Sequence, residues 1–199
     1  MFDKLFGKKK DPSPASPGTP YHPRPIRGSS SAERAAEMLR APSALLQLSP
    51  DEARTVVGYM RPHRIPEGTT FIRERDIERT DFMLLVLDGE VTVESIVVSR
   101  SEPLTVTVLG PGSLIGEMGL LDGEPRSASC TATTEVRGAI LTRDALKQLL
   151  DNEPRTAAKL MMAISLRIAE RMRESTEKLK MYAQLTQAMQ QEINRASSL

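Results

Sequence analysis

Glu117 and Arg126 lie a short distance apart in a glycine-rich segment, residues 110–132, and both suit a small anionic ligand. Glycine lets backbone N–H groups approach a phosphate closely. An arginine guanidinium is a forked, permanently charged partner for phosphate oxygens. A carboxylate accepts hydrogen bonds from ribose hydroxyls and repels a phosphate placed beside it. The segment therefore predicts a site for a small phosphorylated ribose ligand.

The same residues resemble the phosphate-binding cassette of the cyclic nucleotide-binding domain family, which includes catabolite activator proteins and regulatory subunits of cyclic AMP-dependent kinase. The matching positions are Gly116-Glu117-Met118, a turn over residues 121–125, and Arg126-Ser127-Ala128. The resemblance implies that Glu117 binds the ribose 2′-hydroxyl and that Arg126 and Ser127 bind the cyclic phosphate, helped by backbone N–H groups of residues 116–118. The alternative is a surface salt bridge between Glu117 and Arg126 on a β-roll that binds nothing.

The chain divides into a tail, a central domain and a long helix. Residues 1–30 are rich in Pro, Ser and Gly and cannot build a packed core, which predicts a disordered tail. Its start carries Phe2, Leu5 and Phe6 before three lysines, a pattern that allows a weak contact with an anionic membrane surface, although a segment this short favours a disordered start. Residues 31–153 form the expected domain, and residues 154–196 form the expected long dimerisation helix.

Local signals predict the elements of the central domain. Capping boxes are expected at residues 30–33 and 49–52 of a helical stretch that spans residues 30–62 and is broken by Pro42. Residues 63–141 read as short strands, and Asp88-Gly89 between apolar runs predicts a hairpin. The resemblance makes the fold mainly β with helices: a jelly-roll-like β-roll preceded by short helices and followed by a long C-terminal helix. Arg75 stands at a turn where the family usually has glycine nearby.

The long helix carries a heptad seam. Its members follow alternating steps of four and three residues: Met161, Ser165, Ile168, Met172, Ser175, Leu179, Tyr182, Thr186, Met189 and Ile193. This spacing favours a parallel, two-stranded homodimer. The alternative is a single helix lying on its own barrel, although the seam is longer than a small barrel can cover.

Residues 165–178 resemble the dimerisation helix of catabolite activator proteins. Two neighbouring hydroxyl residues of that helix touch the adenine base in the family, and the matching positions are Ser175 and Thr176. The alternative is that Ser175 is a tolerated polar seam residue and Thr176 is exposed. Together with Ser127 after the arginine, the hydroxyl pair favours cAMP over cGMP.

Composition excludes other classes of protein. A net charge of +1 gives no global attraction to nucleic acid, and one cysteine, Cys130, suits a reducing cytoplasm. No apolar run is long enough to cross a bilayer, and no signal peptide is evident. The two histidines, His22 in the tail and His63 before the first expected strand, have no spaced partners for a metal or a nucleophile.

These features predict a cytoplasmic, dimeric cAMP sensor that signals through an unknown protein partner. No enzymatic activity, cofactor or metal is expected. One alternative is a ligand-free interaction or scaffold module. Another is a transcription regulator of the catabolite activator type, but the residues after Thr186 show no helix-turn-helix pattern, so DNA binding is not expected.

Overall fold

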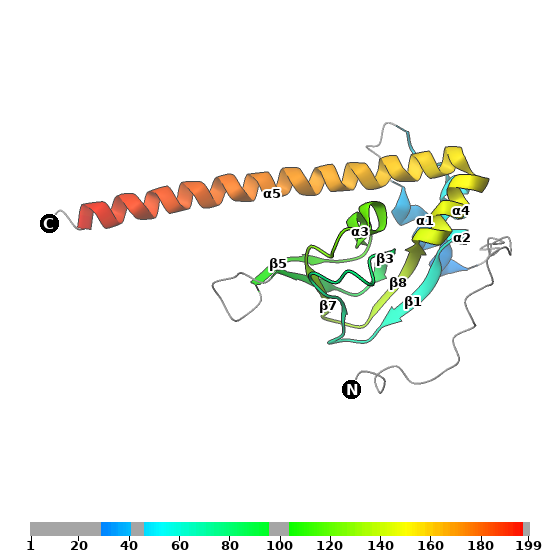
Figure 1. Ribbon diagram of the computed structural model, residues 1–199, viewed down its shortest axis with the longest axis horizontal. Helices are drawn as coiled ribbons and strands as arrows, with labels where there is room; N and C mark the ends of the chain where they lie inside the picture. Colours follow the sequence, from blue (N-terminus) through cyan, green and yellow to red (C-terminus); the bar gives the residue numbers. More distant parts are fainter. Residues whose placement is uncertain (1–28, 41–45, 96–103, 197–199) are drawn as a thin grey trace.

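The computed structural model describes residues 29–40, 46–95 and 104–196 (Figure 1). Three expectations lie outside these residues: the disordered proline-rich tail, the membrane contact of Phe2, Leu5 and Phe6, and Pro42 as the end of the first helix. Among the described residues, no helix has the length and apolarity needed to cross a membrane.

Two antiparallel sheets form the body of the domain. The first has the order β1-β8-β3-β6, with β1 at Arg61–Ile65, β8 at Val136–Thr142, β3 at Phe82–Asp88 and β6 at Leu114–Ile115. The second has the order β2-β7-β4-β5, with β2 at Thr70–Ile72, β7 at Ser129–Ala132, β4 at Val91–Ser95 and β5 at Leu104–Leu109. Helices lie on one side of this β-roll (Figure 1). The predicted fold class is confirmed.

β3, a central strand of the first sheet, is buried on both faces and separates two apolar cores. One core lies between the sheets and includes Leu84, Val86 and Val136. The other lies between the first sheet and the helices and includes Met83, Leu85 and Leu141. Successive residues of β3 therefore point into different cores, which explains why its sequence is an unbroken apolar run.

The hairpin predicted at Asp88-Gly89 is wrong. β3 already has β8 and β6 as its two neighbours, so β4 starts the other sheet, between β7 and β5. The chain crosses from one sheet to the other at Gly89, which has a φ of 90°. A Cβ at this position would lie 2.4 Å from the carbonyl oxygen of Glu135. The glycine therefore serves a crossing between layers rather than a two-residue turn.

The first strand also begins earlier than expected. Residues 61–65 form β1, so the helical stretch does not extend to residue 62, and His63 lies within β1 opposite Gly138. Four of the five β1 side chains are exposed because β1 is an edge strand. The apolar alternation that identifies half-buried strands is absent there.

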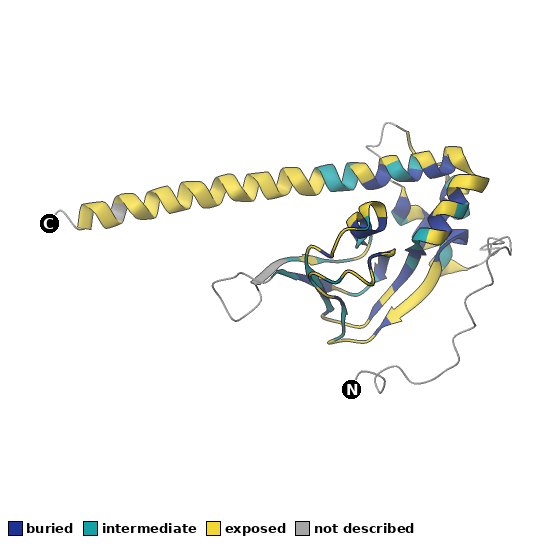
Figure 2. Cartoon of the chain, viewed as in Figure 1, coloured by how far each residue is buried: buried dark blue, intermediate teal, exposed yellow. Residues whose placement is uncertain are grey.

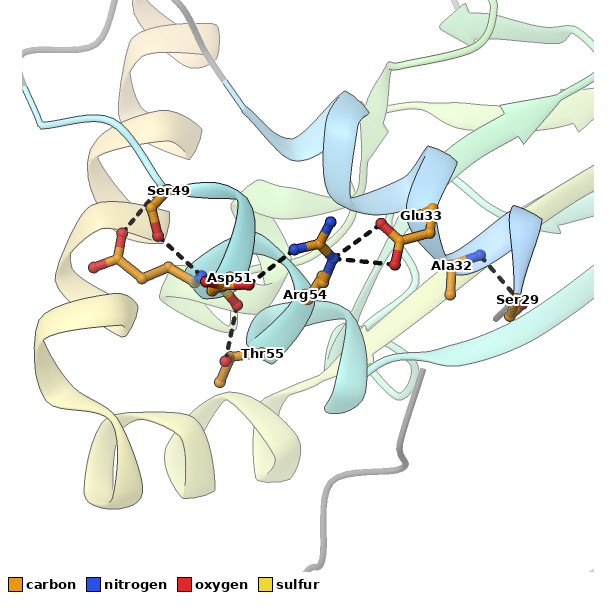
Figure 3. A network of polar contacts seen from close by, with 8 residues as sticks. Ser29, Ala32, Glu33, Ser49, Asp51, Arg54 and Thr55 are labelled. Atoms are coloured by element: carbon orange, nitrogen blue, oxygen red, sulfur yellow. Dashed lines mark hydrogen bonds and ion pairs between the residues drawn. The ribbon is translucent and has the colours of Figure 1, made fainter. Parts of the chain in front are cut away.

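α1 (Ser30–Leu39) starts one residue earlier than its predicted cap at Ser30 implies. Ser29, not Ser30, is the N-cap, and its hydroxyl accepts a hydrogen bond from the Ala32 N–H at 3.4 Å (Figure 3). The capping box predicted at residues 30–33 is therefore wrong. The Glu33 carboxylate instead accepts hydrogen bonds of 2.9 and 3.0 Å from Arg54 of α2 (Pro50–Gly58).

The second predicted capping box is confirmed. The Ser49 hydroxyl accepts from the Glu52 N–H at 3.2 Å, and the Glu52 carboxylate accepts from the Ser49 N–H at 2.7 Å. Pro50 occupies the first turn of the helix. Figure 3 shows Ser49 with its dashed hydrogen bonds at the start of α2. Lys159 of the long helix donates to both carboxylate oxygens of the same glutamate. The cap thereby fixes α2 against that helix.

The long helix α5 (Pro154–Ala196) follows α4 (Arg143–Asn152), whose N-cap is Thr142 as expected. Near its start α5 packs on the domain, where Leu160 and Ile164 are fully buried. Arg167 then donates to the carbonyls of Met38 in α1 and Gly112 in the turn before β6. Beyond Ala169 the helix projects past the β-roll, and its described side chains are exposed (Figure 2).

Candidate functional site

The central element of the site is a short helix that the sequence reading missed. α3 (Glu117–Asp122) follows β6 directly. It begins in the Gly116-Glu117-Met118 motif and ends within the first two residues of the predicted turn, residues 121–125. Glycines in the left-handed region stand at both of its ends, Gly116 with a φ of 82° and Gly123 with a φ of 77°. A Cβ at Gly116 would lie 2.7 Å from Nη1 of Arg126. Glycine is therefore required there both for backbone conformation and for space.

Arg126 lies beneath α3 and donates to backbone carbonyls. Its Nη1 donates to the Gly116 oxygen at 2.7 Å, and its Nε and Nη2 donate to the Arg79 oxygen at 3.0 and 2.8 Å. Nη2 also donates to the Phe82 oxygen at 2.9 Å, and the guanidinium carbon lies 4.7 Å from the centroid of the Phe82 ring. These contacts join the cassette to the segment before β3. They account for four of the five N–H donors of the side chain.

Arg126 makes no direct ion pair within the described residues, and the carboxylates of Asp76, Asp81 and Glu117 act on its charge only from a greater distance. The residue is 4% exposed, and burial lowers the pKa of its guanidinium from the usual value. Within the described parts of the chain, no carboxylate lies at ion-pair distance from it. Carbonyl dipoles and the Phe82 ring compensate part of the charge. A buried cation of this kind favours an anion nearby.

Glu117, the first residue of α3, pairs with a residue that was not predicted. Its Oε1 accepts a hydrogen bond of 2.6 Å from Nη1 of Arg171 in α5. Glu117 is 4% exposed, whereas the Arg171 side chain is 44% exposed. The alternative of a salt bridge between Glu117 and Arg126 is not what the structure shows.

The cassette borders a cavity of about 100 Å³ between the two sheets, α3 and α5. Apolar β-strand residues line it together with the charged groups of α3, Arg126 and Arg171. The lining residues are Ile72, Val93, Leu109, Ile115, Gly116, Glu117, Met118, Gly119, Asp122, Glu124, Pro125, Arg126, Ser127, Ala128, Cys130 and Arg171. The cavity is smaller than the roughly 300 Å³ at which pockets for drug-sized ligands begin. A nucleotide would therefore also occupy the open mouth.

Six of the eight predicted site residues line this one cavity: Gly116, Glu117, Met118, Arg126, Ser127 and Ala128. The other two, Ser175 and Thr176, are exposed on α5 one turn beyond Arg171 and are not among the lining residues. The Thr176 hydroxyl donates to the Met172 carbonyl at 2.9 Å. Arg171 itself lies in the helix stretch that carried the resemblance, one helical turn before Ser175. The pairing of Arg171 with Glu117 has no local signal because the two residues are far apart in sequence.

The comparisons with known proteins agree with this geometry. Residues 62–153 match the family model of the cyclic nucleotide-binding domain. A solved cyclic nucleotide-binding domain from Methylobacillus flagellatus is 34% identical, with a TM-score of 0.69, and the match covers 74% of this chain and 81% of that one. The chain belongs to the cyclic nucleotide-binding domain family. The matched residues include the whole cassette, so the resemblance of the cassette to this family is confirmed.

Two curated relatives of this cyclic nucleotide-binding domain have names that refer to cAMP. The CRP-like cAMP-activated global transcriptional regulator of Mycobacterium tuberculosis is 26% identical over 132 residues, which cover 66% of this chain and 58% of the relative. The cyclic AMP receptor protein of Thermus thermophilus is 30% identical over 123 residues, which cover 62% and 56%. The chain thus spans less than two thirds of the length of these relatives.

Proposed function

We propose that this chain is a sensor that binds a cyclic nucleotide in the cavity beside α3. The observation that supports the proposal most directly is the buried guanidinium of Arg126, which has no carboxylate within ion-pair distance in the described residues. An anionic ligand in the cavity would supply the missing counter-charge. Because four N–H groups of Arg126 already donate to carbonyls, one N–H at Nη1 remains for a phosphate oxygen.

The charge at the inner wall of the cavity fits a monoanion. Glu117 and Arg171 neutralise each other as an ion pair at 2.6 Å, which leaves the one positive charge of the buried Arg126. Asp122 and Glu124 also border the cavity, but they are exposed, so water and salt screen them. A cyclic phosphate diester carries one negative charge, whereas a phosphate monoester carries about 1.5 to 2 at neutral pH. The balance favours a cyclic nucleotide over a 5′-monophosphate.

Glu117 is the candidate partner of the ribose. Its Oε1 accepts from Arg171, and a carboxylate has further lone pairs that can accept a hydrogen bond from a hydroxyl group. The 2′-hydroxyl is free in a 3′,5′-cyclic nucleotide. We therefore propose that Glu117 binds the 2′-hydroxyl and that Arg126 and Ser127 bind the cyclic phosphate.

We further propose that two copies pair through α5. Leu179 is 67% exposed and Met189 is 58% exposed in the single chain, with Met172, Tyr182 and Ile193 exposed on the same seam. Burial of such a seam against an identical helix would stabilise a parallel dimer. In that dimer, Ser175 and Thr176 would approach the mouth of the cavity and contact the base.

Three further parts of the proposal concern the preferred nucleotide, the protein partner and DNA. Ser127 and the hydroxyl pair on α5 favour cAMP over cGMP. The curated relatives include transcription regulators, potassium channels and kinase regulatory subunits, which supports binding rather than catalysis but assigns no single output. We propose that the chain signals through a protein partner. α5 runs unbroken to Ala196 where a helix-turn-helix would need an interruption, so we propose no DNA binding by the described residues.

Calorimetric titration with cAMP, cGMP and 5′-AMP tests nucleotide binding. We expect saturable binding of cAMP, weaker binding of cGMP and little binding of 5′-AMP. Arg126→Ala should abolish binding. Because Arg126 also donates to three carbonyls, Arg126→Lys is the second variant, and we expect it to fold and to bind at least about tenfold more weakly. Arg137→Ala is the matched control, because Arg137 is an exposed arginine of β8 that pairs with Asp88 of β3.

The outcomes separate the alternatives. If the Arg126 variants fold and bind cAMP with wild-type affinity, the assignment of the phosphate site is wrong. If the folded wild-type protein binds no nucleotide, the chain is a ligand-free interaction module instead.

Sedimentation equilibrium tests the dimer independently of nucleotide. Leu179→Glu combined with Met189→Glu places charges on the seam and should convert a dimer into a monomer. Gln184→Glu combined with Gln187→Glu adds the same charge to the opposite, exposed face of α5 and should leave the dimer intact. A wild-type protein that sediments as a monomer at micromolar concentration would exclude the proposed pairing.

A further inference from the structure

α3 has few means of holding its own orientation. It is six residues long, and a helix of that length gains little stability from its own hydrogen bonds. Left-handed glycines at both ends allow the backbone to turn there. The orientation of Glu117 at the start of α3 must therefore depend on side chains from elsewhere in the domain.

Arg126 holds one end of α3, and Arg143 holds the other. Arg143 is the first residue of α4, and its Nη2 donates to the Gly119 carbonyl at 2.6 Å while its Nε donates to the Leu120 carbonyl at 3.2 Å. Its guanidinium also lies against the hinge, since a Cβ at Gly123 would be 3.3 Å from Nη2.

Arg143 places a positive charge at the C-terminal end of α3. The carbonyls in the last turn of a helix carry partial negative charge, so a cation there is stabilising. The Gly119 carbonyl already accepts from the Gly123 N–H at 3.0 Å, and Arg143 adds a second donor to it and a donor to the Leu120 carbonyl. α3 has no basic residue in its own last turn. Arg143 provides the cation from a different element.

Both arginines connect α3 to the same short segment. The backbone N–H of Arg143 donates to the Asp81 carbonyl at 2.7 Å. The side chain of Arg126 donates to the carbonyls of Arg79 and Phe82. Residues 79–82, which lead into β3, are thus a common support for the two ends of α3.

We infer that Arg143 is a positioning residue of the nucleotide site, which fixes α3 and thereby the Glu117 carboxylate that receives the ribose 2′-hydroxyl. This inference rests on the proposed function. Arg143 is not among the residues that line the cavity, so it acts through α3 and not by touching the ligand. The competing explanation is that Arg143 merely ties α4 to the β-roll and affects stability alone.

Titration of wild type, Arg143→Ala and Arg143→Lys with cAMP and 2′-deoxy-cAMP tests the inference. We expect Arg143→Ala to weaken cAMP binding about tenfold and 2′-deoxy-cAMP binding much less, because the loss concerns the hydroxyl that Glu117 receives. Arg143→Lys should restore part of the affinity, since an ammonium can still donate to the Gly119 carbonyl. Arg137→Ala serves again as the control on an exposed arginine.

A double-mutant cycle with Glu117→Ala supplies the decisive readout. If Arg143 acts through Glu117, the double variant should bind cAMP about as weakly as Glu117→Ala alone. Additive losses, or equal losses for both nucleotides, would overturn the inference and leave the proposed function intact. Wild-type cAMP affinity in Arg143→Ala would also overturn the inference without affecting the proposed function. If wild type binds neither nucleotide, the proposed function fails, and this inference fails with it.

Discussion

Glu117 of α3 and Arg171 of α5 share a hydrogen bond of 2.6 Å, although they are 54 positions apart in the chain. The bond joins the cassette to the long helix at the edge of the cavity. A ribose hydroxyl bound at Glu117 would therefore alter the surroundings of the group that holds α5. A ligand can shift α5 only by the difference between its affinities for the two arrangements, so this contact is where such a difference would arise.

Replacement of Arg171 should affect both binding and stability. Arg171→Ala leaves the buried Glu117 carboxylate without its ion-pair partner, and we expect the free energy of unfolding to fall by about 1–2 kcal/mol. The value is modest because Arg171 is partly exposed to water. We also expect weaker cAMP binding. Urea unfolding and calorimetry measure the two effects, with Arg173→Ala on exposed α5 as control. Unchanged values for both would show that the ion pair has no role.

Arg75 occupies a backbone conformation that favours glycine. Its φ is 65°, and its N–H donates to the Arg126 carbonyl at 2.8 Å. Arg75→Gly relieves the left-handed strain but increases the freedom of the unfolded chain, so we expect a net stabilisation of about 0.5–1 kcal/mol. Thermal unfolding measures it. Glu78→Gly in the same exposed loop should destabilise, and a lower melting temperature for Arg75→Gly would contradict the strain argument.

Features that depend on residues close together in the chain could be predicted from the sequence. The Ser49–Glu52 capping box, the start of α5 at Pro154 and the cassette positions all rest on local patterns, and the structure contains them. The sequence also predicts an unusual turn at Arg75, and its φ is 65°. What could not be predicted depends on the arrangement in space.

Three particular errors illustrate that limit. Asp88-Gly89 has the local signature of a hairpin, but the neighbours of β3 are decided by the whole sheet. β1 lacks apolar alternation because its side chains face water at an edge. The partner of Glu117 comes from a helix that follows the β-roll, so no spacing within the cassette could indicate Arg171.

The contact between Glu52 and Lys159 should make stability dependent on acid pH. Hydrogen bonds from Lys159, at 2.6 and 2.7 Å, and from the Ser49 N–H hold the pKa of Glu52 below its usual value. The unfolded chain therefore binds a proton at higher pH than the folded one. The stabilisation is present above the unfolded pKa of about 4.3 and is lost as pH falls through the lower folded pKa.

Lys159→Met provides the measurement. We expect it to lower the free energy of unfolding at pH 7, and we expect the difference from wild type to shrink as the pH falls below about 4. Urea unfolding at both pH values gives the two differences. A difference that stays constant across this range would mean that Lys159 stabilises through packing alone.

Cys130 should be an unreactive thiol in the folded protein. It is buried where it lines the cavity, and burial raises its pKa to about 12. Because the thiolate is the reactive form, iodoacetamide at pH 8 should modify native Cys130 at least on the order of a hundredfold more slowly than the urea-unfolded protein. cAMP should slow the reaction further by filling the cavity. Equal rates in native and unfolded protein would show that the thiol is accessible.

The exposed part of α5 is a lever arm. From Arg171 to Ala196 the helix continues for about 25 residues, which at about 1.5 Å per residue is a rod of roughly 37 Å. A rotation of about 10° around the contact at Glu117 would carry the far end through roughly 6 Å, without any change in the helix itself. A displacement too small to notice inside the cavity would thus arrive at Ala196 as a movement wider than the pitch of a helical turn.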